Sequence, residues 1–207
     1  YLPMATHLDV LPGKITPGGF ADMAAHRQPM SPVYNQYSRL AVDPEHDPAR
    51  EGERMIFGPL FRTGFLIEYF MRANGWFGAS QLVVTSASSK TALGLASVAS
   101  ENSPDIKRIG LTSPKNVSFV ESTGHYHEVI AYDAISAIAA QQSVSVDFAG
   151  NAALLGQVHK HLGGSLNYSC LVGATHIDAR STLGGGSDMP GPKPVLFFAP
   201  DHAVALF

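Results

Sequence analysis

From residue 81 onward, short apolar runs alternate along the chain with segments of helical periodicity. In the first run, residues 81–86, Val83 and Val84 are β-branched and suit a strand that is covered on both faces of a sheet. Strands that alternate with helices of about ten residues form βαβ units, which place their strands in one parallel sheet. We therefore predict an α/β fold with a doubly wound parallel sheet.

The same patterns predict the remaining elements. Further strands are expected at residues 108–112, 128–132, 143–148, 166–172 and 195–198, and helices at residues 63–73, 89–100, 114–123, 134–141 and 152–162. Asn151 is the expected cap of the last helix, which Gly163 is expected to end. In helix 89–100, Ala92 and Gly94 are expected to keep the helix slim where it lies against the sheet.

The first 42 residues differ in character from the rest. Residues 1–40 are interrupted by proline and glycine, which predicts irregular β structure. Residues 43–54 hold two prolines and seven acidic or basic side chains, and we expect a solvated loop there that opens a second domain, residues 43–207. The chain starts without an initiator methionine and stops at Phe207 in what reads as the middle of an element, so we expect a longer protein.

Composition and charge narrow the classes of partner. The net charge is −3 without a basic run, which argues against nucleic acid as a partner. The single cysteine, Cys170, excludes an internal disulfide framework and fits a reducing compartment. No segment approaches the apolar length of a membrane span, and no signal peptide opens the sequence. We expect a cytoplasmic protein that acts on a small-molecule substrate, with no membrane partner.

The turn after the first predicted strand is crowded with small residues and leads directly into a helix. A helix N-terminus presents free backbone N–H groups, which is where nucleotide phosphates bind. The glycine fingerprint Gly-x-Gly-x-x-Gly is absent, and Ser86-x-x-Ser89-x-x-Ala92 stands in its place. The candidate phosphate-binding residues are Ser86, Ala87, Ser88, Ser89, Lys90 and Thr91.

Two other interpretations of this turn are open to the sequence. One is a tight strand-to-helix turn that binds no ligand. The other is a degraded P-loop, because Ser89-Lys90-Thr91 imitates its Gly-Lys-Thr ending. Val84 and Ser89 occupy the two glycine positions of a P-loop, and a valine does not readily adopt the backbone conformations that wrap a triphosphate. We therefore favour a dinucleotide over a triphosphate.

The end of the second predicted strand bears on which dinucleotide is bound. Sites selective for NAD place an acidic residue there to bind the ribose 2′-hydroxyl, whereas this strand ends without one. Hydroxyl and amide side chains and one lysine are present instead, and positive charge suits the 2′-phosphate of NADP. The residues assigned to this contact are Thr112, Ser113, Lys115 and Asn116.

Small residues also follow the fourth and fifth predicted strands. Ligands in open α/β sheets bind beyond the carboxyl ends of the strands, and small side chains there would leave room for a nicotinamide ring. Backbone groups at these turns would hold its carboxamide. The residues assigned to this part of the site are Ala149, Gly150, Asn151, Gly173, Ala174 and Thr175.

Several of these segments together resemble the medium-chain dehydrogenase/reductase superfamily. They occur in the matching order along the chain: Gly18–Asp22, Pro59–Tyr69, Ser86–Ala92, Leu111–Asn116, Asp147–Asn151 and Leu171–Thr175. The amino-acid sequences of the last four segments are similar to those of an uncharacterised bacterial branch, known only as a domain of unknown function. The loss of every fingerprint glycine is a departure from the superfamily pattern.

The resemblance implies a Rossmann dinucleotide-binding domain preceded by a β-rich remnant of a GroES-like substrate domain, residues 1–42. It also implies a homodimer joined through the last sheet strands, near Val195–Ala199. Together with the strand ends, it favours an NADP(H)-dependent oxidoreductase that transfers hydride to or from a carbonyl or activated alkene, like the zinc-independent quinone and enone reductases. The alternative is an NADP(H)-binding sensor or scaffold without catalysis.

The histidines predict no metal site. His159 and His161 form an i, i+2 pair in a helical pattern and are expected on its solvated face. Without a Cys/His cluster of zinc spacing, we predict no zinc site. His176, Tyr34 and Tyr37 are candidate proton donors, but none is predicted to be the catalytic residue.

Overall fold

A computed structural model describes residues 7–172 and 189–206 of the chain. The chain divides into two compact units, residues 1–59 with 200–207 and residues 60–199. The predicted division near residue 43, and the GroES-like origin of the first unit, stay predictions. Within the described residues, no helix has the combination of length and apolar character that crossing a bilayer requires.

The first unit contains a small antiparallel sheet, as the proline- and glycine-rich pattern predicts. Its strands are β1 (Pro12–Thr16), β2 (Gly19–Asp22) and β3 (Gln36–Ser38), in the order β1-β2-β3. Phe20 and Tyr37 stack across β2 and β3 with ring centroids 4.8 Å apart. Gly19 is required where these strands meet, because a Cβ there would lie 1.9 Å from the carbonyl oxygen of Tyr37. The unit also includes most of α6 (Ala199–Leu206).

The predicted loop at residues 43–54 is wrong at its end, because α1 (Glu51–Ala73) begins inside it. A 3₁₀ turn, η4 (Pro48–Arg50), leads into this helix, and the Asp47 side chain caps the turn by accepting from the Ala49 amide at 2.9 Å. Glu51 and Glu53 then lie in the first turn of α1, where acidic side chains are favourable. The charges that resembled a solvated loop thus belong to a helix N-terminus.

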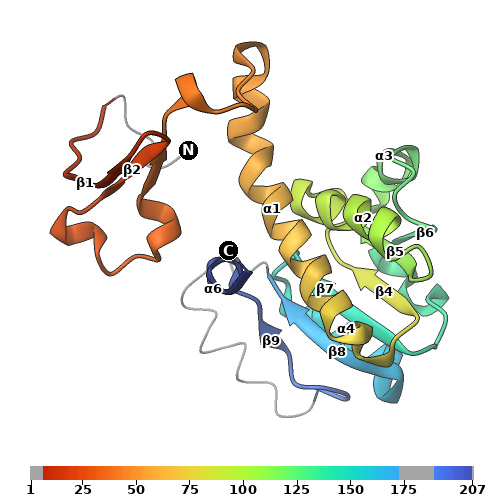
Figure 1. The fold of residues 1–207 in the computed structure, drawn as a ribbon. Helices are drawn as coiled ribbons and strands as arrows, with labels where there is room; N and C mark the ends of the chain where they lie inside the picture. Colours follow the sequence, from red (N-terminus) through yellow and green to blue (C-terminus); the bar gives the residue numbers. More distant parts are fainter. Residues whose placement is uncertain (1–6, 173–188, 207) are drawn as a thin grey trace. The chain divides into compact units, whose positions relative to one another are not determined.

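The second unit contains a six-stranded sheet in which every pairing is parallel (Figure 1). Its strand order is β6-β5-β4-β7-β8-β9. This arrangement confirms the predicted doubly wound α/β fold. The strands are β4 (Gln81–Val84), β5 (Lys107–Thr112), β6 (Glu128–Ala131), β7 (Ser143–Asp147), β8 (Leu166–Leu171) and β9 (Val195–Leu196).

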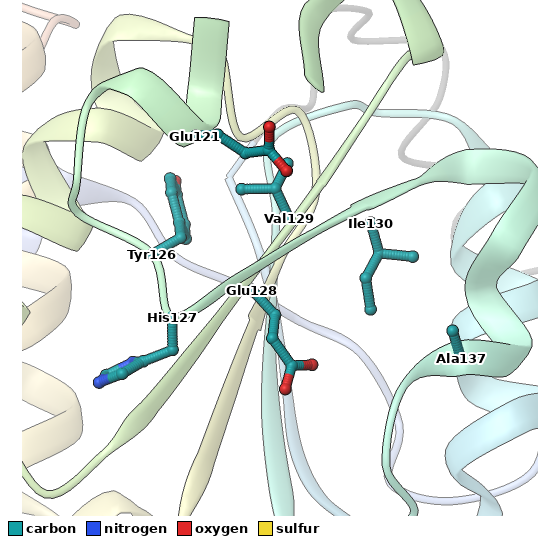
Figure 2. A pocket seen from close by; sticks show the side chains of 7 residues that line it. All are labelled: Glu121, Tyr126, His127, Glu128, Val129, Ile130 and Ala137. Carbon is teal, nitrogen blue, oxygen red and sulfur yellow. The ribbon is translucent and has the colours of Figure 1, made fainter. Parts of the chain in front are cut away.

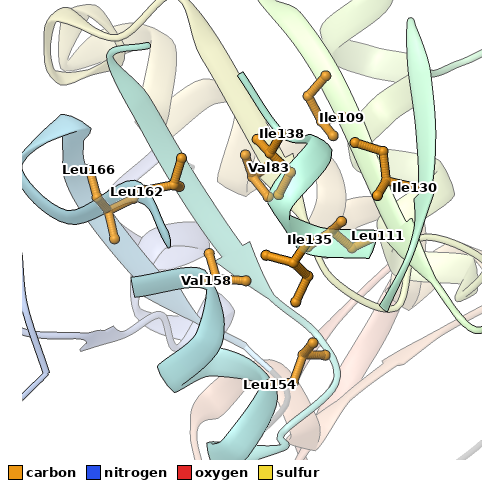
Figure 3. Packing of buried hydrophobic residues seen from close by; sticks show 10 residues of the cluster. All are labelled: Val83, Ile109, Leu111, Ile130, Ile135, Ile138, Leu154, Val158, Leu162 and Leu166. Atoms are coloured by element: carbon orange, nitrogen blue, oxygen red, sulfur yellow. The ribbon is translucent and has the colours of Figure 1, made fainter. Parts of the chain in front are cut away.

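One face of the sheet packs against α4 (Ala152–Leu162) and a 3₁₀ segment, η7 (Tyr132–Ala137). Val83 of β4 lies at the centre of this core, with Ile135 from η7 and Val158 from α4 packed in the same cluster (Figure 3). The other residues of the cluster are Ile109, Leu111, Ile130, Ile138, Leu154, Leu162 and Leu166. This core holds β4, β5 and β6 against α4 and thereby fixes where their carboxyl ends lie.

The predicted helix at residues 134–141 is wrong, because only the short segment η7 forms there. Ile135 and Ile138 both pack into the core cluster, and the carbonyl of Ala139 accepts a hydrogen bond from the Gln81 side chain at 3.1 Å. A continuing α-helix would withdraw that carbonyl from Gln81. Tertiary contacts have here overridden the helix propensity of alanine.

The helices α1 and α2 (Lys90–Asn102) lie side by side over the opposite face of the sheet (Figure 1). Their close approach depends on two glycines. A Cβ on Gly64 would lie 2.5 Å from the backbone nitrogen of Leu95, and one on Gly94 would lie 3.3 Å from the Cα of Phe61. Gly94 therefore makes room for α1, and the predicted role of this glycine against the sheet is wrong. A further helix, α3 (Val117–Ser122), lies beside β6.

The placement of His159 on a solvated face is also wrong, because its side chain is fully buried. Its Nδ1 lies 3.0 Å from the carbonyl oxygen of Pro190, which can only accept, so Nδ1 carries the proton. The hydroxyl of Ser169 then donates to Nε2 at 2.9 Å, and Ser145 donates to Ser169 at 3.3 Å. Burial disfavours the charged ring, so the imidazole is neutral in this chain of hydrogen bonds.

Acidification is expected to weaken the fold through His159. Burial lowers its pKa below the usual 6.5, so an unfolded chain takes up the proton first as the pH falls. The contribution of His159 to the free energy of unfolding should be constant well above pH 6.5. Below pH 6.5 it should decline by up to about 1.4 kcal/mol per pH unit. Urea denaturation of wild type and His159→Gln between pH 5 and 8 measures the slope. Equal slopes in the two proteins would contradict the assignment.

Candidate functional site

The strand order places the candidate site between the neighbouring strands β4 and β7. Counted from the first strand of the sheet, the order is 3-2-1-4-5-6, in which chain connections run outward in both directions from the neighbouring strands β4 and β7. Ligands of doubly wound sheets bind at this switch point, beyond the carboxyl ends of the strands. Residues 85–90 follow β4 there, and residues 148–151 follow β7.

The residues Ser86–Ser89, which we call the serine loop, form a tight turn between β4 and α2. The Ser89 amide donates to the Ser86 carbonyl at 2.8 Å, and the Ala87 amide donates to the Leu111 carbonyl of β5 at 3.0 Å. The Ser89 hydroxyl caps α2 by accepting from the Ala92 amide at 3.3 Å. Ser86 has a φ of +51°, the left-handed conformation that glycine adopts at lowest cost.

The hydroxyl groups of two tyrosines hold the serine loop in place. The Tyr132 hydroxyl accepts from the Ser86 amide at 3.1 Å. The Tyr126 hydroxyl lies 3.3 Å from the Ala87 carbonyl and 3.2 Å from the Ala92 carbonyl, to which it donates. Burial raises the pKa of both phenols, so both are protonated at neutral pH. The loop is therefore fixed by contacts within the protein despite its lack of glycine.

Gly110 of β5 makes the position of Tyr126 possible. A Cβ at residue 110 would lie 3.0 Å from the Ala87 Cβ and 3.1 Å from the Tyr126 ring. The ring therefore occupies the space over Gly110, and its hydroxyl reaches Ala87 of the serine loop. Tyr126, Tyr132 and Gly110 were absent from the predicted site, since no spacing in the sequence connects them to residues 86–89.

Two of the side chains assigned to the 2′-phosphate, those of Thr112 and Asn116, contact the serine loop. The Ser88 hydroxyl accepts from the Asn116 amide at 3.1 Å and from the Thr112 hydroxyl at 3.5 Å. Because a hydroxyl has one proton and two lone pairs, Ser88 keeps its own proton for a further partner. The Ser113 hydroxyl oxygen is buried without a hydrogen-bond partner among the described residues, and Lys115 is exposed.

The segment after β7 is held differently. The Asp147 carboxylate, which is 3% exposed, accepts from the Thr85 hydroxyl and from the amides of Ala149 and Gly150 at 3.3 and 3.1 Å. Asn151 caps α4 as predicted, accepting from the Leu154 amide at 3.1 Å. Gly173, Ala174 and Thr175 lie outside the described residues.

Replacing Ser86 with glycine should relieve the backbone at its left-handed position. We expect the free energy of unfolding to stay equal or to rise by up to about 1 kcal/mol. Ser100→Gly inside α2 is the matched control and should cost about 0.5 kcal/mol, because its backbone is helical. Chemical denaturation measures both. If Ser86→Gly lowered the free energy of unfolding as much as Ser100→Gly does, this result would contradict the left-handed backbone conformation of Ser86.

The described residues contain a separate hollow of about 480 Å³ at the outer edge of the sheet, around β6 (Figure 2). Its lining residues are Glu121, Tyr126, His127, Glu128, Val129, Ile130 and Ala137. Only Tyr126 belongs to both this hollow and the surroundings of the serine loop. Glu128 is paired with Lys107 at 2.6 Å, and the His127 Nδ1 accepts from the Arg108 amide at 2.9 Å. Two of the seven lining residues, His127 and Glu128, thus have partners in the sheet. The hollow lies around the edge strand β6, which β5 separates from β4 of the switch point.

Among the described residues, neither a reactive thiol nor a cluster of metal-binding side chains is found. Cys170 lies inside β8, and burial raises its pKa well above the usual value, so its thiol is unreactive at neutral pH. In the part of the chain that the structure describes, no three histidine, cysteine, aspartate or glutamate residues gather in a way that could hold a metal ion.

Comparison with known proteins assigns the chain to a family. The family described as protein of unknown function, DUF2855, matches residues 1–206. The chain belongs to this family. No curated protein matches it.

One solved structure similar to the chain is that of a cobalt- and zinc-bound thermostable alcohol dehydrogenase from Pyrobaculum aerophilum, at 15% identity and a TM-score of 0.42. The similarity covers 84% of this chain and 49% of that one, so the chain spans about half the length of the dehydrogenase. The fold assignment rests on the observed strand order and not on this similarity.

Proposed function

We propose that this member of DUF2855 binds NADP(H) at the carboxyl ends of β4, β5 and β7. The observation that carries the proposal is the strand order 3-2-1-4-5-6, with the serine loop at its switch point. This order is the one found in dinucleotide-binding sheets, where the pyrophosphate lies at the N-terminus of the helix after the first strand. That helix is α2, which runs for 13 residues and is capped by Ser89.

Hydrogen-bond donors are available to a pyrophosphate on this side of the switch point. Ser88 retains its hydroxyl proton, since its lone pairs are engaged by Asn116 and Thr112. The N-terminal dipole of α2 adds favourable positive potential. Since Tyr126 and Tyr132 already hold the loop, its ordering would cost little when the nucleotide binds.

Preference for NADP over NAD is proposed from the end of β5. No carboxylate follows the strand, while Ser113 offers a hydroxyl and Lys115 offers a positive charge. The buried hydroxyl of Ser113, unpartnered among the described residues, is consistent with a site that gains a partner on binding. A 2′-phosphate beside Lys115 would be stabilised by a charge-assisted hydrogen bond.

When bound, the nicotinamide cofactor would supply the hydride chemistry of an oxidoreductase acting on a carbonyl or activated alkene. The contribution of this chain would be to bind and orient the cofactor and to exclude water from it. Binding without catalysis is a second candidate, favoured by a specific observation. The polar side chains at the switch point, Thr85, Asp147 and Tyr132, are all hydrogen-bonded within the protein.

Purified protein mixed with NADPH and a panel of quinones and enals separates these functions. Loss of NADPH absorbance that depends on both protein and acceptor would support the oxidoreductase. Saturable NADPH binding without turnover on the whole panel would support the sensor or scaffold instead. Absence of binding at millimolar NADPH would overturn the proposed function in both forms.

A further inference from the structure

We propose that Thr85 and Asp147 are positioning residues that hold the segment Phe148–Gly150 ready for the nicotinamide half of the dinucleotide. The inference rests on the proposed NADP(H) site and deepens it. Thr85 follows β4 and Asp147 ends β7, so the pair joins the two strands at the switch point. Both side chains are buried, at 1% and 3% exposure.

Every amide of the segment is turned toward this pair. The Phe148 and Ala149 amides donate to the Thr85 hydroxyl oxygen at 3.0 and 3.2 Å. The Ala149 amide is shared with the Asp147 carboxylate, which also accepts from the Gly150 amide at 3.1 Å. The Thr85 hydroxyl donates its own proton to the Asp147 carboxylate. Gly150 has a φ of +63°, a conformation that glycine allows without strain.

The direction of the amides fixes the direction of the carbonyls. In a trans peptide, the C=O of one residue points opposite to the N–H of the next. With the Ala149 and Gly150 amides turned toward the pair, the carbonyls of Phe148 and Ala149 point away from it. The Asp147 carbonyl is already engaged by the Val172 amide at 2.9 Å. The segment therefore offers hydrogen-bond acceptors to a ligand above the strand ends, and its amides are not available to an anion.

The two sides of the switch point then differ in chemistry. The serine loop and α2 offer donors suited to phosphate, whereas Phe148–Gly150 offers acceptors suited to ribose hydroxyls or a carboxamide NH₂. The buried negative charge of Asp147 also disfavours phosphate on its side. A dinucleotide would be bound in one orientation, with its nicotinamide riboside over β7.

Thr85→Val removes the hydroxyl while keeping the β-branched shape, and Thr85→Ser keeps the hydroxyl. Binding of NADPH and of 2′,5′-ADP, which lacks the nicotinamide half, is measured by isothermal titration for each protein. We expect Thr85→Val to weaken NADPH about tenfold or more and 2′,5′-ADP less than threefold, with Thr85→Ser close to wild type. Ser145→Ala, a buried hydroxyl of β7 that bonds Ser169, is the control and should change neither.

Asp147→Asn gives a second test if Thr85→Val does not fold, because the amide keeps one acceptor oxygen and loses the other. It should show the same difference between the two ligands. Equal losses for both ligands, or no loss for either, would overturn the positioning role while leaving the proposed function intact. If wild type bound neither ligand, the proposed function itself would fail, and this inference with it.

Discussion

Lys115→Glu is expected to abolish the preference for NADPH over NADH that we propose for this protein. The substitution replaces a positive charge at the end of β5 with a negative one beside the proposed 2′-phosphate. Loss of the attraction and gain of a repulsion should weaken NADPH by about ten- to a hundredfold at low salt, whereas NADH should be affected little. Titration of both nucleotides against both proteins measures the ratio of the two dissociation constants.

Lys160→Glu is the matched control for this prediction. Lys160 is an exposed lysine in the last turn of α4, and the reversal produces the same change of net charge. It should leave the ratio of the NADPH and NADH dissociation constants at the wild-type value. A Lys115→Glu protein that retained its preference for NADPH would show that the 2′-phosphate is bound elsewhere.

Gly64→Ala is expected to destabilise the second unit more than alanine at any other helical glycine of the described residues. The added Cβ would meet the backbone of α2, 2.5 Å from the Leu95 nitrogen, and backbone cannot move aside as a side chain can. The two helices must separate, which should lower the free energy of unfolding by about 1–3 kcal/mol. Chemical denaturation of wild type and variant gives the difference directly.

Gly156→Ala in α4 is the control with the opposite expected sign. A Cβ at residue 156 meets no atom within 4 Å, and alanine restricts the unfolded chain more than glycine does. We expect an increase of about 0.5–1 kcal/mol in the free energy of unfolding. A Gly64→Ala protein as stable as Gly156→Ala would contradict the close packing of α1 on α2.

The sheet could be predicted from the sequence because its central strands are buried on both faces. Such strands read as continuous apolar or small-residue runs, as in β4, where all four residues are buried. The segment 134–141 could not be predicted in the same way. Its alanines favour a helix locally, while the contacts of Ile138 and of the Ala139 carbonyl depend on strands distant in the sequence.

His159 could have been placed correctly from its spacing. It lies one turn beyond Leu155 and three residues before Leu162, and both of these are buried residues of α4. The i, i+4 and i+7 positions of a helix share a face, so the apolar stripe already included the histidine.

Candidate site residues could be predicted where local motifs carry them, and not where the fold assembles them. Asn151 follows from the capping rules and lies at the start of α4, as expected. The sequence holds one signal for Thr85 and Asp147, because each is a polar residue at the end of a predicted buried strand. Nothing local in the sequence connects Tyr126 or Tyr132 with the serine loop, because 39 and 46 positions separate the hydrogen-bonded residues.

A crystal structure of the protein grown with saturating NADPH tests the central claim most directly. The account predicts density for the pyrophosphate beside Ser88 and the start of α2, the 2′-phosphate near Lys115, and the nicotinamide riboside over the carbonyls of Phe148 and Ala149. Nucleotide bound at the hollow around β6, or a switch point left empty at saturating NADPH, would contradict it.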